Sequence, residues 1–166
     1  MRAALTLQSL REVVKSLVDT PGFDRVYDKI KLLSAIPGKV VCEMKVEEQH
    51  TNRAGTLHGG LAATLVDVVS TVALMNTERG EPGDLDPFVV GGSRVALKDL
   101  VLLNSTQIWF RENFRYISAP KMGEEMLITG QVMKQGRRIA FTTADLTNKA
   151  TGKIVAQGRH TKYLGP

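Results

Sequence analysis

Cysteine is almost absent from this chain, which has a single one, Cys42, among its 166 residues. One cysteine excludes an internal disulfide and any metal site built from several cysteines. Such usage is typical of proteins from a reducing compartment. The three histidines do not form the HExxH pattern of zinc hydrolases, so we expect no metal and no other cofactor.

Aromatic residues are also scarce, at 5% of the chain. Proteins that bind single-stranded nucleic acids stack bases on aromatic side chains, and few such platforms exist here. The net charge is +5, but no run of five or more basic residues accompanies it. We therefore do not expect a nucleic-acid partner, and the charge also suits an anionic small molecule or a membrane surface.

Long apolar runs are missing too. The most apolar stretch, residues 61–75, is shorter than the roughly 20 residues that a membrane-spanning helix needs, and it contains Asp67. The N-terminus has no apolar signal-peptide core, and we expect no integral membrane association. Residues 7–18 have the pattern of an amphipathic helix; a weak mitochondrial leader is one interpretation, but the acidic Glu12 and Asp19 favour an ordinary packing helix.

The pattern along the chain predicts one α+β domain over residues 1–166. Residues 61–75 are apolar around almost the whole circumference, which is typical of a buried helix. One buried helix with several alternating strands favours a curved antiparallel sheet wrapped around a long central helix. The other predicted elements are helices over 7–18 and 23–30 and strands over 39–46, 124–134, 138–146 and 153–163.

The segment His58-Gly59-Gly60 lies where the central helix is predicted to begin. The first amides of a helix have no partner within it and carry the positive end of the helix dipole. Two glycines would leave these amides unshielded, so that a ligand carbonyl can approach closely. The segment therefore predicts an oxyanion-binding site, although a tight turn into the helix explains the glycines equally well.

Asp67 is the second candidate, because burying a carboxylate in an apolar helix is costly without partners. It either bridges a neighbouring element or orients and deprotonates a water. It lies eight residues beyond Gly59, or about 12 Å along the helix at 1.5 Å per residue. If both act on one carbonyl carbon, we expect them to come from different subunits of a dimer.

Four segments carry a resemblance to a known family. They are HTNRAGTLHGGLAATLVDVVSTVAL (50–74), DLTNKATGKIVAQGRHTKYLG (145–165), PGKVVCEMKVEE (37–48) and SLREVVKSL (9–17). Together they resemble the hotdog-fold acyl-CoA thioesterases, in particular the PaaI-like branch, over nearly the whole chain.

The resemblance implies a role for each matching residue. The Gly59 N–H would donate to the thioester carbonyl, Asn52 would help to bind that carbonyl, and His58 would shape the same loop. Asp67 would act as the general base or orient the nucleophilic water. The positions implied to contact coenzyme A are Lys134, Gln135, Gly136, Arg137, Arg138, Ile139, Tyr116 and Tyr163, the last of which departs from the histidine that the family leads us to expect.

Residues 84–107 have no counterpart in the resemblance and are predicted to be an atypical insertion or the product of an alternative transcript or exon. In the family, a serine on the next strand assists the water. Alignment from either side places Trp109 or Leu85 at that position, and neither side chain can do this. Ser105 or Thr106 would substitute only if the strand shifts register.

The resemblance implies hydrolysis of medium- to long-chain fatty acyl-CoA to free fatty acid and coenzyme A. It also implies a homo-oligomer that is a dimer of dimers, a phosphatidylcholine-transfer protein as partner, and a location in the cytoplasm, mitochondrion or nucleus. The missing serine leaves a catalytically impaired acyl-CoA-binding or interaction protein as the alternative. A hydratase is disfavoured because no histidine lies four or five residues after Asp67.

Overall fold

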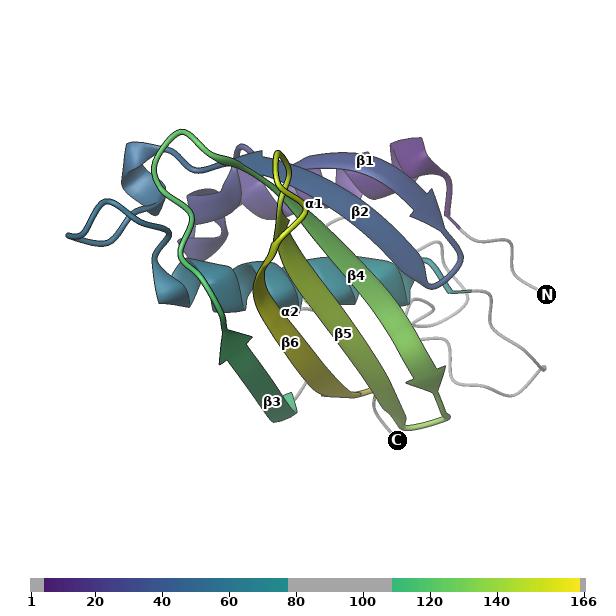
Figure 1. Ribbon diagram of the computed structural model, residues 1–166. Coiled ribbons are helices and arrows are strands. Elements are labelled where there is room, and N and C mark those ends of the chain that lie inside the picture. The colour runs from purple at the N-terminus through teal and green to yellow at the C-terminus, as the bar shows by residue number, and fades with distance from the viewer. Residues whose placement is uncertain (1–4, 78–108, 165–166) are drawn as a thin grey trace.

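The computed structural model describes residues 5–77 and 109–164 (Figure 1). In these ranges an antiparallel sheet has the order β1-β2-β4-β5-β6-β3, and one long helix, α2 (Gly59–Met75), lies against one of its faces. The predicted α+β architecture, a sheet around a central helix, is confirmed. The strands are β1 (Lys31–Ile36), β2 (Lys39–Lys45), β3 (Trp109–Tyr116), β4 (Glu125–Gln135), β5 (Ile139–Asn148) and β6 (Ile154–Tyr163).

The N-terminal helix α1 (Leu7–Asp19) forms where the amphipathic pattern predicts it. The Thr6 side chain accepts a hydrogen bond from the Ser9 N–H at 3.1 Å, which caps the first turn. The second predicted helix is the shorter 3-10 helix η1 (Phe23–Tyr27). The chain then enters β1, a strand that the sequence analysis does not predict because only Leu32 in it is buried and its apolar residues do not alternate.

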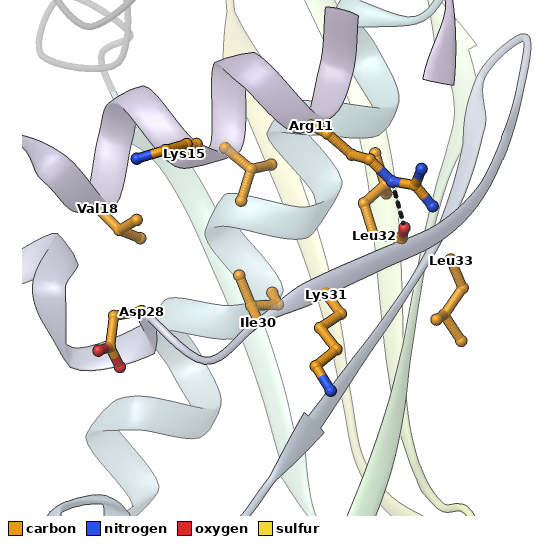
Figure 2. Close-up of a pocket in the computed structure, with 9 residues that line it drawn as sticks. Arg11, Lys15, Val18, Asp28, Ile30, Lys31, Leu32 and Leu33 are labelled. Atoms are coloured by element: carbon orange, nitrogen blue, oxygen red, sulfur yellow. Dashed lines mark hydrogen bonds between the residues drawn. The ribbon is translucent and has the colours of Figure 1, made fainter. Parts of the chain in front are cut away.

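A pocket of about 440 Å³ lies between α1 and β1, and Figure 2 shows its lining. The Arg11 Nε donates to the Leu32 carbonyl at 3.1 Å and joins the helix to the strand. Val18, Ile30 and Leu33 add apolar walls. None of the candidate site residues predicted from the sequence lines this pocket. Its lining residues attach α1 to the sheet.

Two glycines of the sheet allow α2 to approach it closely. A Cβ added at Gly130 in β4 would lie 2.5 Å from the Val69 carbonyl oxygen, and one at Gly158 in β6 would lie 2.4 Å from a Val66 methyl. Real Cβ atoms do not come this close to other heavy atoms. The missing side chains therefore set the depth at which α2, and Asp67 with it, lies on the sheet.

The C-terminal strands β4, β5 and β6 form the predicted antiparallel meander. The turn between β4 and β5 is closed by a hydrogen bond from the Gly136 N–H to the Ile139 carbonyl at 2.9 Å. Residues 84–107, predicted to be an insertion, lie outside the described residues, as do Leu85, Ser105 and Thr106. In the described ranges, no helix is long and apolar enough to cross a membrane.

Candidate active site

The N-terminus of α2 is capped by a side chain that the sequence analysis assigned to loop shaping. His58 is the N-cap residue, and its Nδ1 accepts a hydrogen bond from the Gly60 N–H at 3.0 Å. The expectation of two unshielded amides is therefore wrong for Gly60, whose N–H is occupied. A Cβ at Gly60 would also lie 3.1 Å from that nitrogen, so a glycine is favoured there to leave room for the imidazole.

The Gly59 amide is in a different situation. Within the described part of the chain its N–H donates no hydrogen bond, whereas its carbonyl accepts one from the Tyr116 hydroxyl at 3.0 Å. Gly59 also lines a pocket of about 360 Å³. A backbone donor at the positive end of a helix, in a residue that lines a pocket, can bind a carbonyl oxygen on which negative charge develops. The pocket is lined by Asn52, Leu57, Gly59, Ala62, Tyr116, Ile117, Ser118, Ala119, Pro120, Val155 and Ala156.

Asn52 lies on the wall of the same pocket and organises the loop before α2. Its Oδ1 accepts from the Ala54 N–H at 2.9 Å, which forms a turn closed by the side chain. Its Nδ2 donates to the Thr56 hydroxyl at 3.0 Å. One amide proton is thus used inside the loop, and the second is the group available to a ligand carbonyl. The structure therefore brings Asn52, Gly59 and Tyr116 together, with His58 as the cap behind them.

Asp67, in the middle of α2, lies in a buried charged cluster. Its Oδ1 is 2.7 Å from the Lys162 Nζ and 3.1 Å from the His160 Nδ1. Lys162 also donates to the Thr71 hydroxyl at 2.6 Å. The His160 and Lys162 side chains are 1% and 2% exposed, whereas the Asp67 side chain is 14% exposed. Of the three groups, the carboxylate is the one that solvent reaches.

The electrostatics of the cluster keep Asp67 ionised. Burial raises the pKa of the Asp67 carboxyl, but the contact with His160 and the charge and hydrogen bond of Lys162 outweigh burial and hold this pKa below its ordinary value. Tyr27 of η1 is buried nearby; burial first, then Asp24 and Asp67, raises the pKa of its phenol, which stays neutral. An ionised carboxylate is an acceptor that can orient a water, but a low pKa makes it a weak base.

His160 and Lys162 are the site residues that the sequence analysis missed. They alternate with Thr161 along β6 and face α2, with the burial pattern of core residues. Polar residues at two such positions of a strand are the signal that would have found them. His160 also removes the argument made against a hydratase, since a histidine does lie beside Asp67; its 1% exposure, however, disfavours proton exchange with a substrate.

The predicted coenzyme A residues lie at the other end of the sheet. Tyr163 pairs with Ile139 at the end of the β4–β5 hairpin. It follows Ala156, which lines the Gly59 pocket, by seven residues, or about 23 Å of strand at 3.3 Å per residue. Of the hairpin residues, Lys134, Gly136, Arg137 and Arg138 are exposed, and Gln135 and Ile139 are half-buried. Within one chain, Tyr116 alone of the predicted coenzyme A contacts lies beside Gly59.

Metal ligands are not grouped in the residues that the structure describes, where no three His, Cys, Asp or Glu side chains come together. The free thiol of Cys42 is buried, and burial raises its pKa to about 12, so it does not supply a thiolate.

Comparisons with known proteins identify the family of the chain. Residues 54–155 match the model of the thioesterase superfamily. The chain is 52% identical to mouse acyl-coenzyme A thioesterase 13 over 158 residues, 95% of this chain and 96% of the mouse protein. It is 53% identical to the human protein of the same name, with the same coverage of both chains.

Solved structures give the same result. The crystal structure of zebrafish thioesterase superfamily member 2 matches with a TM-score of 0.79 and 52% identity, covering 98% of this chain and all of the other. The structure of thioesterase superfamily member 2 from mouse matches with a TM-score of 0.74 and 49% identity over 96% of this chain and 97% of that one. The resemblance seen in the sequence is confirmed: this chain is a member of the thioesterase superfamily and has the hotdog fold.

Proposed function

We propose that this protein hydrolyses fatty acyl-CoA thioesters to free fatty acid and coenzyme A. The observation that carries the proposal is the Gly59 N–H, which has no hydrogen-bond partner in the described residues and lies at a helix N-terminus on the wall of a pocket. The relatives named acyl-coenzyme A thioesterase 13 support the choice of acyl-CoA as substrate.

In this proposal Gly59 binds the thioester carbonyl oxygen and stabilises the charge that develops on it. Asn52 contributes its second amide proton, and His58 fixes the turn by capping α2. Asp67 accepts a hydrogen bond from the attacking water and aims its oxygen at the carbonyl carbon. Its low pKa favours orientation of the water over full proton abstraction in the ground state.

The two halves of the site are proposed to come from different subunits. Asp67 is about 12 Å along α2 from Gly59, too far for both to act on one thioester. The hairpin of Lys134, Gln135, Gly136, Arg137, Arg138 and Ile139 lies with Tyr163 farther still. Two α2 helices running side by side in a dimer would bring one Gly59 to the other Asp67. The cations Lys134, Arg137 and Arg138 would then bind the phosphates of coenzyme A.

The pocket beside Gly59 has mostly apolar walls, which suits an acyl chain of medium to long length. Assembly of two dimers into a tetramer, association with a phosphatidylcholine-transfer protein, and a cytoplasmic, mitochondrial or nuclear location complete the proposal. Sedimentation of the purified protein tests the assembly: an active monomer would contradict the shared site.

The function is tested by release of free thiol from palmitoyl-CoA, with wild type and Asp67→Ala measured side by side. If the wild type releases thiol and Asp67→Ala does not, the result supports hydrolysis at this site. Tight acyl-CoA binding by the wild type without thiol release would instead show an impaired, acyl-CoA-binding protein. If the protein instead adds water to an enoyl-CoA, which is measured as a loss of the absorbance of the enoyl group, it is a hydratase.

A further inference from the structure

The contacts around Asp67 point to a role for a residue that cannot touch the substrate. We infer that Lys162 is a positioning residue, which holds Asp67 by one carboxylate oxygen and leaves the other oxygen to orient the attacking water. The inference rests on the proposed hydrolysis and identifies what fixes the geometry of its water-binding half.

The two buried groups from β6 meet the same atom of Asp67. Lys162 Nζ and His160 Nδ1 lie 2.7 Å and 3.1 Å from Oδ1. Among the described residues, Oδ2 has no hydrogen-bond partner in the protein, and the carboxylate retains 14% exposure. The side chain is thus held on one oxygen and open to solvent through the other.

Lys162 is itself held in place by α2. Its Nζ donates to the Thr71 hydroxyl at 2.6 Å and lies 3.4 Å from the Asp67 carbonyl. Thr71 donates in turn to that carbonyl at 2.7 Å. A lysine has three donors, and here they meet three oxygens of one helical turn. This fixes the ammonium, and through it the rotamer of Asp67.

Because Lys162 is buried, it can position Asp67 but cannot bind the substrate. At 2% exposure it cannot contact the coenzyme A phosphates, unlike the exposed cations of the β4–β5 hairpin. Removing its charge should therefore change kcat and leave KM nearly constant. Among the described residues, the groups that face Asp67 from the elements packed on it are Lys162 and His160 of β6 and Tyr27 of η1. Tyr27 stays neutral, whereas the charge of Lys162 is among the causes that hold the pKa of the Asp67 carboxyl low.

The test is the pH profile of kcat with palmitoyl-CoA for wild type, Lys162→Met and Lys162→Arg. Loss of a neighbouring opposite charge typically raises a carboxyl pKa by about one unit or more. We expect the acid limb of kcat to move to higher pH by about one unit in Lys162→Met, with kcat at neutral pH reduced and KM within about twofold of wild type. Lys162→Arg should keep the acid limb at the wild-type pH.

A matched control is Lys149→Met. Lys149 also bridges two carboxylates, Glu43 and Glu125, but on the exposed face of the sheet. Its variant should reproduce the wild-type profile. The inference is overturned if folded Lys162→Met has the wild-type acid limb and kcat, or if its KM rises in proportion to the loss of kcat/KM.

A second measurement covers the case in which Lys162→Met does not fold. In wild-type protein labelled with ¹³C-aspartate, the Asp67 carboxyl resonance, assigned with Asp67→Asn, is followed against pH. Titration below the range of ordinary aspartates supports the inference, and titration within or above that range overturns it. This measurement does not depend on turnover, so a wild type that releases no thiol would refute the proposed function while the ionisation of Asp67, on which the inference depends, is still decided.

Discussion

The beginning and the middle of α2 are two unlike environments on one helix. The pocket at Gly59 is lined by residues of which none carries a full charge, and its donor is a backbone amide. Around Asp67, a buried ammonium group and a buried imidazole lie 2.7 Å and 3.1 Å from the same carboxylate oxygen. In the proposed hydrolysis, the fixed dipole at Gly59 would meet a charge that develops transiently, and the carboxylate that its surroundings keep ionised would orient the water.

The largest expected effect concerns the amide of Gly59. Gly59→Pro removes the N–H at the first helical position, where proline is well tolerated. The ψ of 129° at His58 also suits a residue before proline. Losing one oxyanion donor should lower kcat for palmitoyl-CoA by about 100- to 1000-fold.

Gly59→Ala is the matched control, because it adds a Cβ and keeps the N–H. That Cβ would lie 3.4 Å from the nearest atom of the Tyr116 ring, an ordinary contact. Gly59→Ala should therefore retain most of the activity. Equal losses in the two variants would show that the space at Gly59, and not its amide, matters.

The next effect concerns the depth of α2 on the sheet. Gly130→Ala forces the Val69 backbone away from β4 and should lower the free energy of unfolding by about 1–3 kcal/mol. Urea unfolding measures this. Gly136→Ala, whose Cβ meets only the Ile139 carbonyl oxygen at 3.4 Å, is the control. If Gly130→Ala is as stable as Gly136→Ala, the close approach of α2 is not required.

A smaller effect is expected in acid. Because the pKa of Asp67 is lower in the folded protein, its ionised form contributes stability above the ordinary carboxyl pKa of about 4. This contribution is lost as the pH falls through the lower folded value. Between pH 5 and 2, wild type should therefore lose stability more steeply than Asp67→Asn in thermal unfolding. If the two proteins lose stability equally steeply, the ionisation of Asp67 does not contribute to the free energy of unfolding.

The smallest effect concerns Tyr116. Tyr116→Phe removes the hydrogen bond to the Gly59 carbonyl, and one such bond contributes about 0.5–1.5 kcal/mol, equivalent to a 2- to 10-fold decrease in kcat. Ser118→Ala, on the wall of the same pocket, should change kcat less than twofold. If kcat falls more in Ser118→Ala than in Tyr116→Phe, the reaction depends on the pocket wall and not on the hydrogen bond to the Gly59 peptide.

Local pattern was sufficient to predict most of the fold. The circumference of residues 61–75 is apolar, and strands 124–134, 138–146 and 153–163 alternate, so α2 and the meander form as predicted. Strand β1 was missed because its partner β2 and the helix α1 stabilise it, and its own residues do not alternate. Tertiary contacts of this kind leave little trace in a short segment.

Apart from the resemblance, the residue pattern predicted contacts within the candidate site only where its residues are neighbours in the sequence. His58, Gly59 and Gly60 form one turn, yet the capping of Gly60 depends on a rotamer of His58 that spacing does not reveal. The partners of Asp67 come from β6, with Lys162 lying 95 positions along the chain from it. The register of β6 against α2 decides that Lys162 and not Thr161 faces the carboxylate, and a one-residue shift would reverse this.

The glycines at 130 and 158 have a consequence for the choice of positions in directed evolution. Both lie on the sheet surface beneath α2, one on each side of the stretch that holds Asp67, and neither lines the pocket at Gly59. A substitution there would change the depth of α2, which carries Asp67, without replacing a side chain that lines the pocket. A library restricted to the pocket lining would therefore omit the two positions that set the depth of α2 on the sheet, and one that includes 130 and 158 would sample that depth.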